Sequence, residues 1–140
     1  MAGELNAMRD GMPITLHFQA TDPAANATTN LITDLTGAGY MVPAGYVFHP
    51  MLLQVTGDTP VTAQTATFNV TDNTVAIANG PVPVLSTVAG ATLSQAAMAR
   101  FGANPIAAGH IVGVNVVTPA GYLPVTDDFD ALLHGVLALA

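Results

Sequence analysis

The chain has 140 residues, of which 51% are hydrophobic and only 8% are charged, against about 25% charged residues in typical globular domains. Nine acidic residues against two arginines give a formal net charge of −7, which excludes the basic surface that nucleic acids and anionic membranes require. Because the chain has no cysteine, disulfides, thiolate nucleophiles and cysteine-ligated zinc are also excluded. We expect one domain with a hydrophobic core and a largely uncharged surface that contacts other protein.

The N-terminus, residues 1–12, is expected to form an arm in front of a single domain over residues 13–140, and the alternative is a frayed terminus. Leu5 and Met8 have the spacing of one helical face, but their segment is short and ends at Gly11. The chain does not begin with a basic region followed by an apolar run, so we expect no signal peptide. No stretch approaches the roughly 18 consecutive apolar residues of a membrane-spanning helix, so no membrane partner is expected.

Apolar and polar residues alternate from the start of the domain, over residues 14–20, which predicts a strand with one buried face. Residues 23–30 are expected to form a polar loop, and residues 31–36 a second short strand. The expected buried side of the first strand consists of Ile14, Leu16, Phe18 and Ala20.

Residues 46–56 are apolar on both faces, which is typical of a strand that is buried on both sides or carries an interface. Strict alternation separates two rows along this strand. Pro50 favours an edge position or a bulge, because proline cannot donate to the strand ladder. One row holds Val47, Met51, Leu53 and Val55, and the other holds Phe48, Pro50 and Leu52, which are candidate oligomer-interface residues or else pack inside the domain.

Two further segments have clear strand patterns. Residues 65–78 predict a hairpin that turns at Asp72-Asn73, with Ala66, Phe68 and Val70 facing inward. Residues 110–118 form a β-branched run typical of a strand.

Two later segments stay ambiguous, because residues 93–101 and 129–139 fit a helix or a strand by periodicity alone. The tetrapeptide Pro-Ala-Gly-Tyr occurs at 43–46 and again at 119–122, and both copies predict a turn. A series of short strands separated by turns, without alternating helices, predicts an all-β antiparallel sandwich.

The residues that could carry chemistry do not form a recognisable site. The two serines, Ser86 and Ser94, lack the nucleophile-elbow context, and we expect no catalytic nucleophile. Carboxylates at Asp127, Asp128 and Asp130 suit Ca²⁺ in type, but their spacing is not an EF-hand, and a solvated loop is expected there. No enzyme activity, metal or cofactor is therefore expected. Metal-ligand spacing is also absent among the four histidines, His17, His49, His110 and His134.

Three segments resemble one known group when they are taken in order: VPAGYVFHPMLLQV (42–55), TATFNVTDNTVAI (65–77) and FGANPIAAGHIVGVNVVTPAGYLP (101–124). Together with the acidic turn and hydrophobic last segment that follow, they resemble the jelly-roll decoration (cement) and head-spike proteins of tailed bacteriophages. The chain departs from that pattern at His110, where the group has an acidic residue.

This resemblance implies a jelly-roll-like sandwich with an extended N-terminal arm, in which residues 93–101 and 129–139 are strands. It implies a structural virion protein that sits on the outer capsid surface as a homotrimer and fastens neighbouring subunits of the major capsid protein. No catalytic residues carry over from the group. The arm residues expected to contact the capsid are Glu4, Leu5, Met8 and Arg9.

The alternative is a carbohydrate- or receptor-binding β-sandwich on a virion or cell surface. Sugar sites usually stack an exposed aromatic ring against an apolar sugar face. The chain has no tryptophan, and its three tyrosines are Tyr40, Tyr46 and Tyr122, two of them in the repeated turn. This composition favours the virion protein over the sugar-binding domain.

Overall fold

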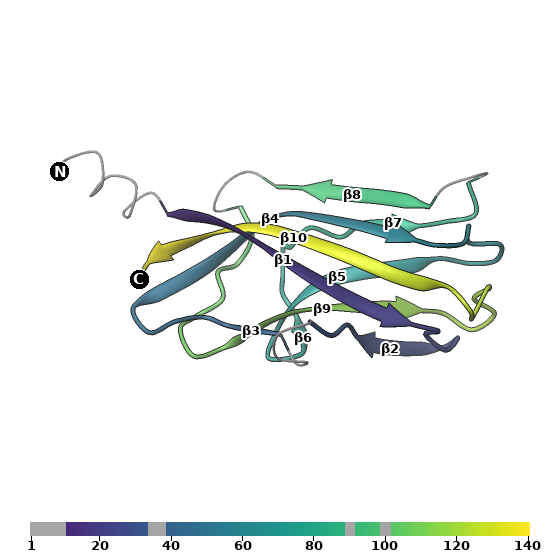
Figure 1. Cartoon of the computed structure of the whole chain (residues 1–140), viewed down its shortest axis with the longest axis horizontal. Coiled ribbons are helices and arrows are strands. Elements are labelled where there is room, and N and C mark those ends of the chain that lie inside the picture. Colours follow the sequence, from purple (N-terminus) through teal and green to yellow (C-terminus); the bar gives the residue numbers. More distant parts are fainter. Residues whose placement is uncertain (1–10, 34–38, 89–91, 99–101) are drawn as a thin grey trace.

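The structure, a computed structural model, describes residues 11–33, 39–88, 92–98 and 102–140 and is built from two antiparallel sheets (Figure 1). These residues contain no helix, and therefore none that is long and apolar enough to cross a membrane. The expected all-β antiparallel class is confirmed.

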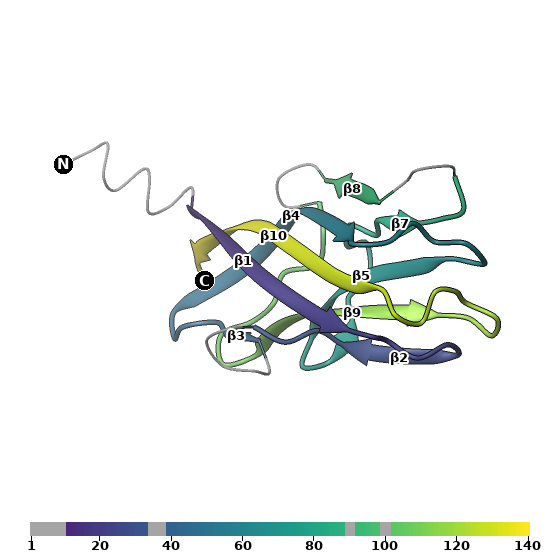
Figure 2. The ribbon, with the colours of Figure 1, turned by 45° about the vertical axis from the view of Figure 1, so that its right-hand side comes forward.

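One sheet has four strands in the order β1-β10-β4-β8. Its two longest members, β4 and β10, lie side by side in the middle, and β1 runs along the outer side of β10 (Figure 2). The sheet joins both ends of the described chain, because the first strand pairs with the last. The bounds are β1 Met12–Thr21, β10 Asp128–Leu139, β4 Tyr46–Gly57 and β8 Leu93–Ala97.

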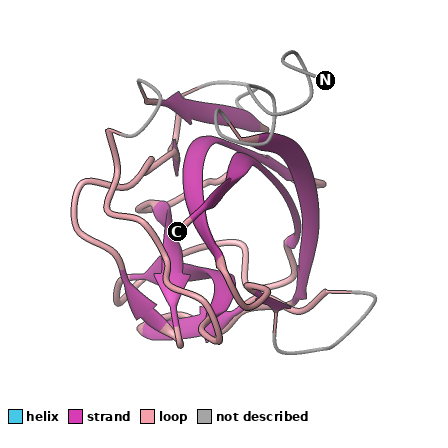
Figure 3. Cartoon of the chain, turned by 90° about the vertical axis from the view of Figure 1, so that its left-hand side faces the viewer, coloured by secondary structure: helices cyan, strands magenta, loops and turns pink. Residues whose placement is uncertain are grey.

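The second sheet has six strands, with the path β2-β9-β5-β6. Two short strands lie off this path, since β3 also pairs with β9 and β7 also pairs with β5. Seen from the end, the strands curl around a central core (Figure 3). The bounds are β2 Ala27–Asn30, β3 Tyr40–Met41, β5 Ala66–Asp72, β6 Val75–Ala76, β7 Val84–Leu85 and β9 Ile111–Thr118.

The core lies between the two sheets and is dominated by large rings. Phe68 of the six-stranded sheet meets Phe129 of the four-stranded sheet edge to face, with ring centroids 5.1 Å apart and planes at 88°. Tyr122 is fully buried beside Phe129. The inward residues expected for β1 and for the 65–78 hairpin are in this core or packed against it, which confirms both patterns.

The two ambiguous segments are strands in their described parts. β8 covers Leu93–Ala97, while residues 99–101 lie outside the described residues. β10 is a strand despite its helical spacing, because it pairs with β1 on one side and β4 on the other. A Cβ added at Gly135 would lie 2.4 Å from Cζ of Phe48, so glycine is required where this ring crosses the strand. Gly135, which would weaken a helix, is thus needed by the sheet.

Two sequence expectations near the N-terminus need correction. The polar segment 23–30 is not all loop, because Ala27–Asn30 forms β2 and pairs with β9. Its threonines and asparagine are tolerated at this exposed sheet edge. In the expected strand 31–36, Ile32 makes only an isolated bridge to Gln19, and residues 34–36 lie outside the described residues.

The turns follow their predicted chemistry. In both Pro-Ala-Gly-Tyr copies the tyrosine N–H donates to the proline carbonyl at 3.2 Å. The glycines, Gly45 and Gly121, have φ of 84° and 83°, the left-handed conformation that this turn needs at its third residue. The hairpin after β5 turns through Asn73 and Thr74, which both have positive φ. This turn lies one residue later than the expected Asp72-Asn73, because Asp72 still pairs with Val75.

A bulge in β4 changes which residues face the core. Leu52 pairs with His134 and Pro50 with Gly135, so Met51 is an extra residue in β4. The strict two-row alternation expected for this strand is therefore wrong. The bulge beside Pro50 confirms the expectation for that proline, and it puts Phe48, Pro50, Leu53 and Val55 on the buried side.

Two of the three candidate interface residues consequently belong to the interior. Phe48 is 0% exposed and lies in the core cluster, and Pro50 is buried beside the bulge. Neither side chain is available to a second molecule in this structure. Leu52, on the opposite side of the strand, is half-buried and faces outward.

Truncation of Phe48 should therefore behave as a core mutation. Phe48→Ala is expected to lower the free energy of unfolding by about 3–5 kcal/mol, because it leaves a cavity above Gly135. Leu52→Ala, the matched change on the outer side, is expected to cost only about 1 kcal/mol. Urea denaturation of both variants measures this, and equal losses would contradict the assignment of Phe48 to the core.

Candidate functional site: the outer face of the four-stranded sheet

The outer face of the four-stranded sheet carries side chains that alternate with the buried residues of its strands. Strand pairing places side chains on it in three rows, each crossing β1, β10, β4 and β8 in that order (Figure 1). The rows are Thr15-His134-Leu52-Ala97, His17-Leu132-Gln54-Gln95 and Gln19-Asp130-Thr56-Leu93.

This outer face is almost free of net charge. Its three rows contain one carboxylate, Asp130, whose Oδ1 lies 2.8 Å from Nε2 of His17. In the first row, the Thr15 hydroxyl is hydrogen-bonded to Nδ1 of His134 at 2.9 Å. The remaining positions are threonine, glutamine, leucine and alanine. Removing water from such an uncharged surface costs little free energy, which suits contact with another protein rather than with a charged ligand.

The other predicted site residues are not brought into this face. Leu52 is the only one of the three interface candidates that contributes to it. The arm residues Glu4, Leu5, Met8 and Arg9 lie outside the described residues, so their expected contacts stay predictions.

A pair of carboxyl groups lies at the end of the same sheet, where β4 ends and β10 begins. The Thr59 N–H donates to Oδ1 of Asp127 at 3.1 Å, and the Tyr122 hydroxyl lies 3.5 Å from its Oδ2. Asp58 accepts the Asp128 N–H at 2.9 Å. Asp127 is 0% exposed, so the expectation of a solvated loop at this residue is wrong.

Burial determines how this pair ionises. It raises the pKa of Asp127 to about 6, and the hydrogen bond with Asp58 acts in the same direction. The backbone N–H of Asp128 lowers the pKa of Asp58, which is exposed. A proton that binds to this pair is therefore held by Asp127, whose buried side chain does not form an open site. The sequence signal was weak, because Asp58 and Asp127 meet only through β4–β10 pairing.

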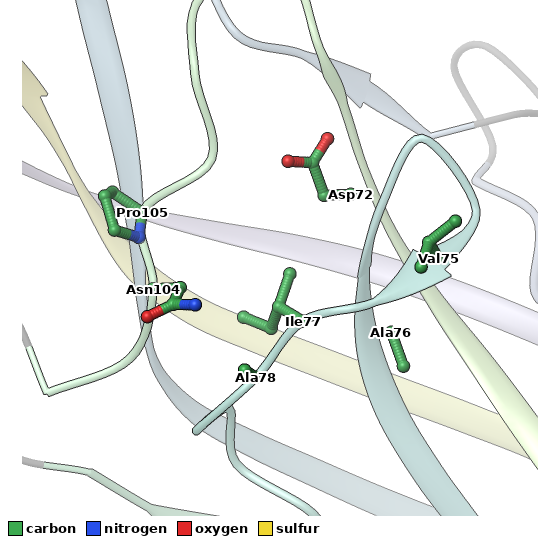
Figure 4. Close-up of a pocket in the computed structure, with 7 residues that line it drawn as sticks. All are labelled: Asp72, Val75, Ala76, Ile77, Ala78, Asn104 and Pro105. Carbon is green, nitrogen blue, oxygen red and sulfur yellow. The ribbon is translucent and has the colours of Figure 1, made fainter.

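A second carboxylate-histidine contact lies at the far end of the six-stranded sheet. Nδ1 of His110 is 2.7 Å from Oδ1 of Asp72, so the histidine at the start of β9 makes a polar contact there. Asp72 also lines an open groove of about 290 Å³. Figure 4 shows Ile77 between Asp72 and the loop that carries Asn104 and Pro105. With one carboxylate among small apolar side chains, the groove lacks a constellation for acid–base or nucleophilic chemistry.

The histidines and serines do not assemble into a metal or catalytic site in the part of the chain that the structure describes. No group of three or more histidine, aspartate or glutamate side chains converges there. Ser94 has a structural contact, because its Oγ accepts the Val84 N–H at 3.2 Å.

Comparisons with known proteins do not place the chain in a family. No protein-family model matches it, and no curated protein matches it.

The buried carboxyl group predicts an unusual pH dependence of stability. Burial raises the pKa of Asp127 in the folded protein to about 6, above the ordinary aspartate value of 3.8, so between these pH values the folded protein binds the proton more tightly than the unfolded chain. The stability from this group is fully present below about pH 3.8 and is lost as pH rises through about 6. Asp127→Asn should therefore gain stability relative to the parent protein at pH 7.5 but not at pH 4.5.

Urea denaturation at the two pH values measures this difference. Asp22→Asn is the matched control, because it changes an exposed carboxylate at the same end of the sheet and leaves the buried one in place. An identical pH profile for Asp127→Asn and the parent protein would show that Asp127 is not the responsible group.

Proposed function

We propose that this protein is a structural virion component that binds the outer surface of a tailed-phage capsid as a homotrimer and stabilises the shell. The observation that carries the proposal is the strand order. Strands from the two halves of the chain pair from the outside inward, β1 with β10, β2 with β9, β4 with β8, and β5 with β7. These pairs alternate between the two sheets. That nesting supports the jelly roll, a fold used by viral capsid proteins, by lectins and by cupins.

The outer face of the four-stranded sheet supports a role in assembly. A protein with a net charge of −7 that has only one carboxylate in the three rows of this face has a surface suited to subunit contact. The resemblance of three sequence segments to phage decoration and head-spike proteins supplies the kind of partner, the major capsid protein. The same resemblance supplies the trimer.

The N-terminal arm is proposed as a second contact with the capsid. Ordering about twelve residues costs roughly 12–24 kcal/mol of backbone entropy, which only a large partner surface offsets. Met12 pairs with Leu137 in β1, so the proposed contact is confined to the residues before Met12.

Sugar binding is less well supported by the aromatic side chains. Tyr122 is buried, and Tyr40 and Tyr46 are half-buried and pack against the core. None of the three tyrosine side chains is fully exposed, whereas sugar sites usually stack an exposed aromatic ring on the sugar.

The proposal predicts a trimer in solution. Size-exclusion chromatography with light scattering at micromolar concentration is expected to give three times the 14.2 kDa chain mass. The mass should not fall on dilution to the lowest measurable concentration. A monomer at all concentrations would contradict the preformed trimer.

Removal of residues 1–11 should separate capsid binding from folding. The truncated protein is expected to keep its thermal unfolding midpoint, because β1 begins at Met12, and to co-sediment with capsid shells at least tenfold more weakly. The shells are those of the phage that encodes the chain, stripped of the native protein. Full co-sedimentation of the truncated protein would remove the arm from the proposal, and failure of the intact protein to bind would remove the function itself.

A further inference from the structure

One edge of the four-stranded sheet is open in the part of the chain that the structure describes. The Gly57 N–H donates to the Thr92 carbonyl at 2.8 Å, and the Met98 N–H donates to the Met51 carbonyl at 2.7 Å. In an antiparallel ladder, the residues that exchange hydrogen bonds with one neighbour alternate along the strand. The backbone N–H and C=O groups of the even-numbered residues of β8 therefore point toward β4. Those of Leu93, Gln95 and Ala97 point away from β4, toward the open edge.

This edge lacks the features that usually block edge-to-edge pairing. β8 contains no proline and no charged residue, and the whole segment 73–99 has no lysine, arginine, aspartate or glutamate. The opposite edge, β1, is protected: Pro13 has no N–H, and Gln19 exchanges two hydrogen bonds with Ile32. β7 does not occupy the open edge, because its contact with β8 runs from the Val84 N–H to the inward Ser94 hydroxyl.

We propose that β8 pairs antiparallel with β8 of a second copy of this chain, about a two-fold axis at Gln95. In this register Gln95 faces its own counterpart, and Leu93, which is 55% exposed, faces Ala97 of the other copy. The three pairs satisfy the outward backbone groups, since each hydrogen-bonded pair exchanges two bonds. The two four-stranded sheets then join edge to edge into one continuous sheet, and their outer faces lie on the same side of it.

The distribution of charge favours antiparallel pairing of two copies, because this orientation keeps their acidic ends apart. Asp58, Asp127 and Asp128 gather where β4 ends, next to the Leu93 end of β8. Antiparallel pairing puts the acidic end of one copy at the opposite end of the joined sheet from that of the other. The contact itself is uncharged, so two copies with a net charge of −7 each can approach there.

This contact is independent of the proposed trimer. A strand that pairs with itself generates a two-fold axis, which does not close a ring of three. If the proposed function holds, β8 pairing links one trimer to the next. The β8 proposal itself depends only on the pairing of β8 and does not require the trimer.

A single cysteine tests the pairing directly, because the chain has none of its own. In a hydrogen-bonded antiparallel pair the Cα atoms are about 5.5 Å apart, within disulfide range. Gln95→Cys is therefore expected to form covalent dimers under mild oxidation. Gln54→Cys is the matched control, because Gln54 is the register partner of Gln95 on the next strand inward. Equal crosslinking of the two variants, or none with Gln95→Cys, would overturn the proposal.

A second variant tests the contact without oxidation. Gln95→Lys puts two ammonium groups opposite each other at the two-fold axis and is expected to weaken concentration-dependent association at least tenfold in sedimentation velocity. Thr28→Lys, at an exposed position of β2 in the other sheet, is the control and is expected to leave association unchanged. The trimer mass should persist in both variants if the proposed function holds, so loss of the trimer and loss of β8 pairing are separate readouts. Unchanged association with Gln95→Lys would also count against the proposal.

Discussion

The pairing of β10 on both of its sides is the constraint on which the rest of the structure depends. This last strand pairs with β1 from Met12 to Thr21 and with β4 from Tyr46 to Gly57. Its inward residues, among them Phe129 and Leu133, are part of the hydrophobic core. β10 is the only strand with which β1 forms a ladder among the described residues. The four-stranded sheet therefore depends on contacts between distant parts of the sequence.

Local departures from regular geometry make that central pairing possible. The ring of Phe48 crosses β10 where Gly135 leaves room for it. Immediately beyond this crossing, Met51 bulges out of β4, and the register with β10 shifts by one residue. Without the extra residue, Phe48 and Leu53 would face opposite sides of the sheet, because side chains alternate along a strand. The bulge thus lets both ends of a twelve-residue strand contribute to one core.

The parts of the fold that could be predicted were those with a local signal. The alternation over 14–20 and the hairpin over 65–78 need only a period of two and turn residues that accept positive φ. β2, by contrast, is a polar strand, Ala27–Asn30, that exists because β9 offers it an edge. The bulge at Met51 left no mark in the hydrophobic pattern beyond Pro50, and the burial of Asp127 depends on its distant neighbours Asp58 and Thr59.

The positions of the carboxylates explain how an acidic chain can have a nearly uncharged outer sheet face. Among the residues that the structure describes, carboxylates are either gathered at one end of the four-stranded sheet, as with Asp58 and Asp127, or contact a histidine, as with Asp72 and Asp130. Neither arrangement leaves an isolated charge in the middle of the sheet. Salt screens interactions between exposed charges but has little effect on backbone hydrogen bonds and apolar contacts. The proposed association through this face and its β8 edge would therefore depend on shape and on outward-pointing backbone groups, while the acidic end would disfavour alignments that place two such ends together.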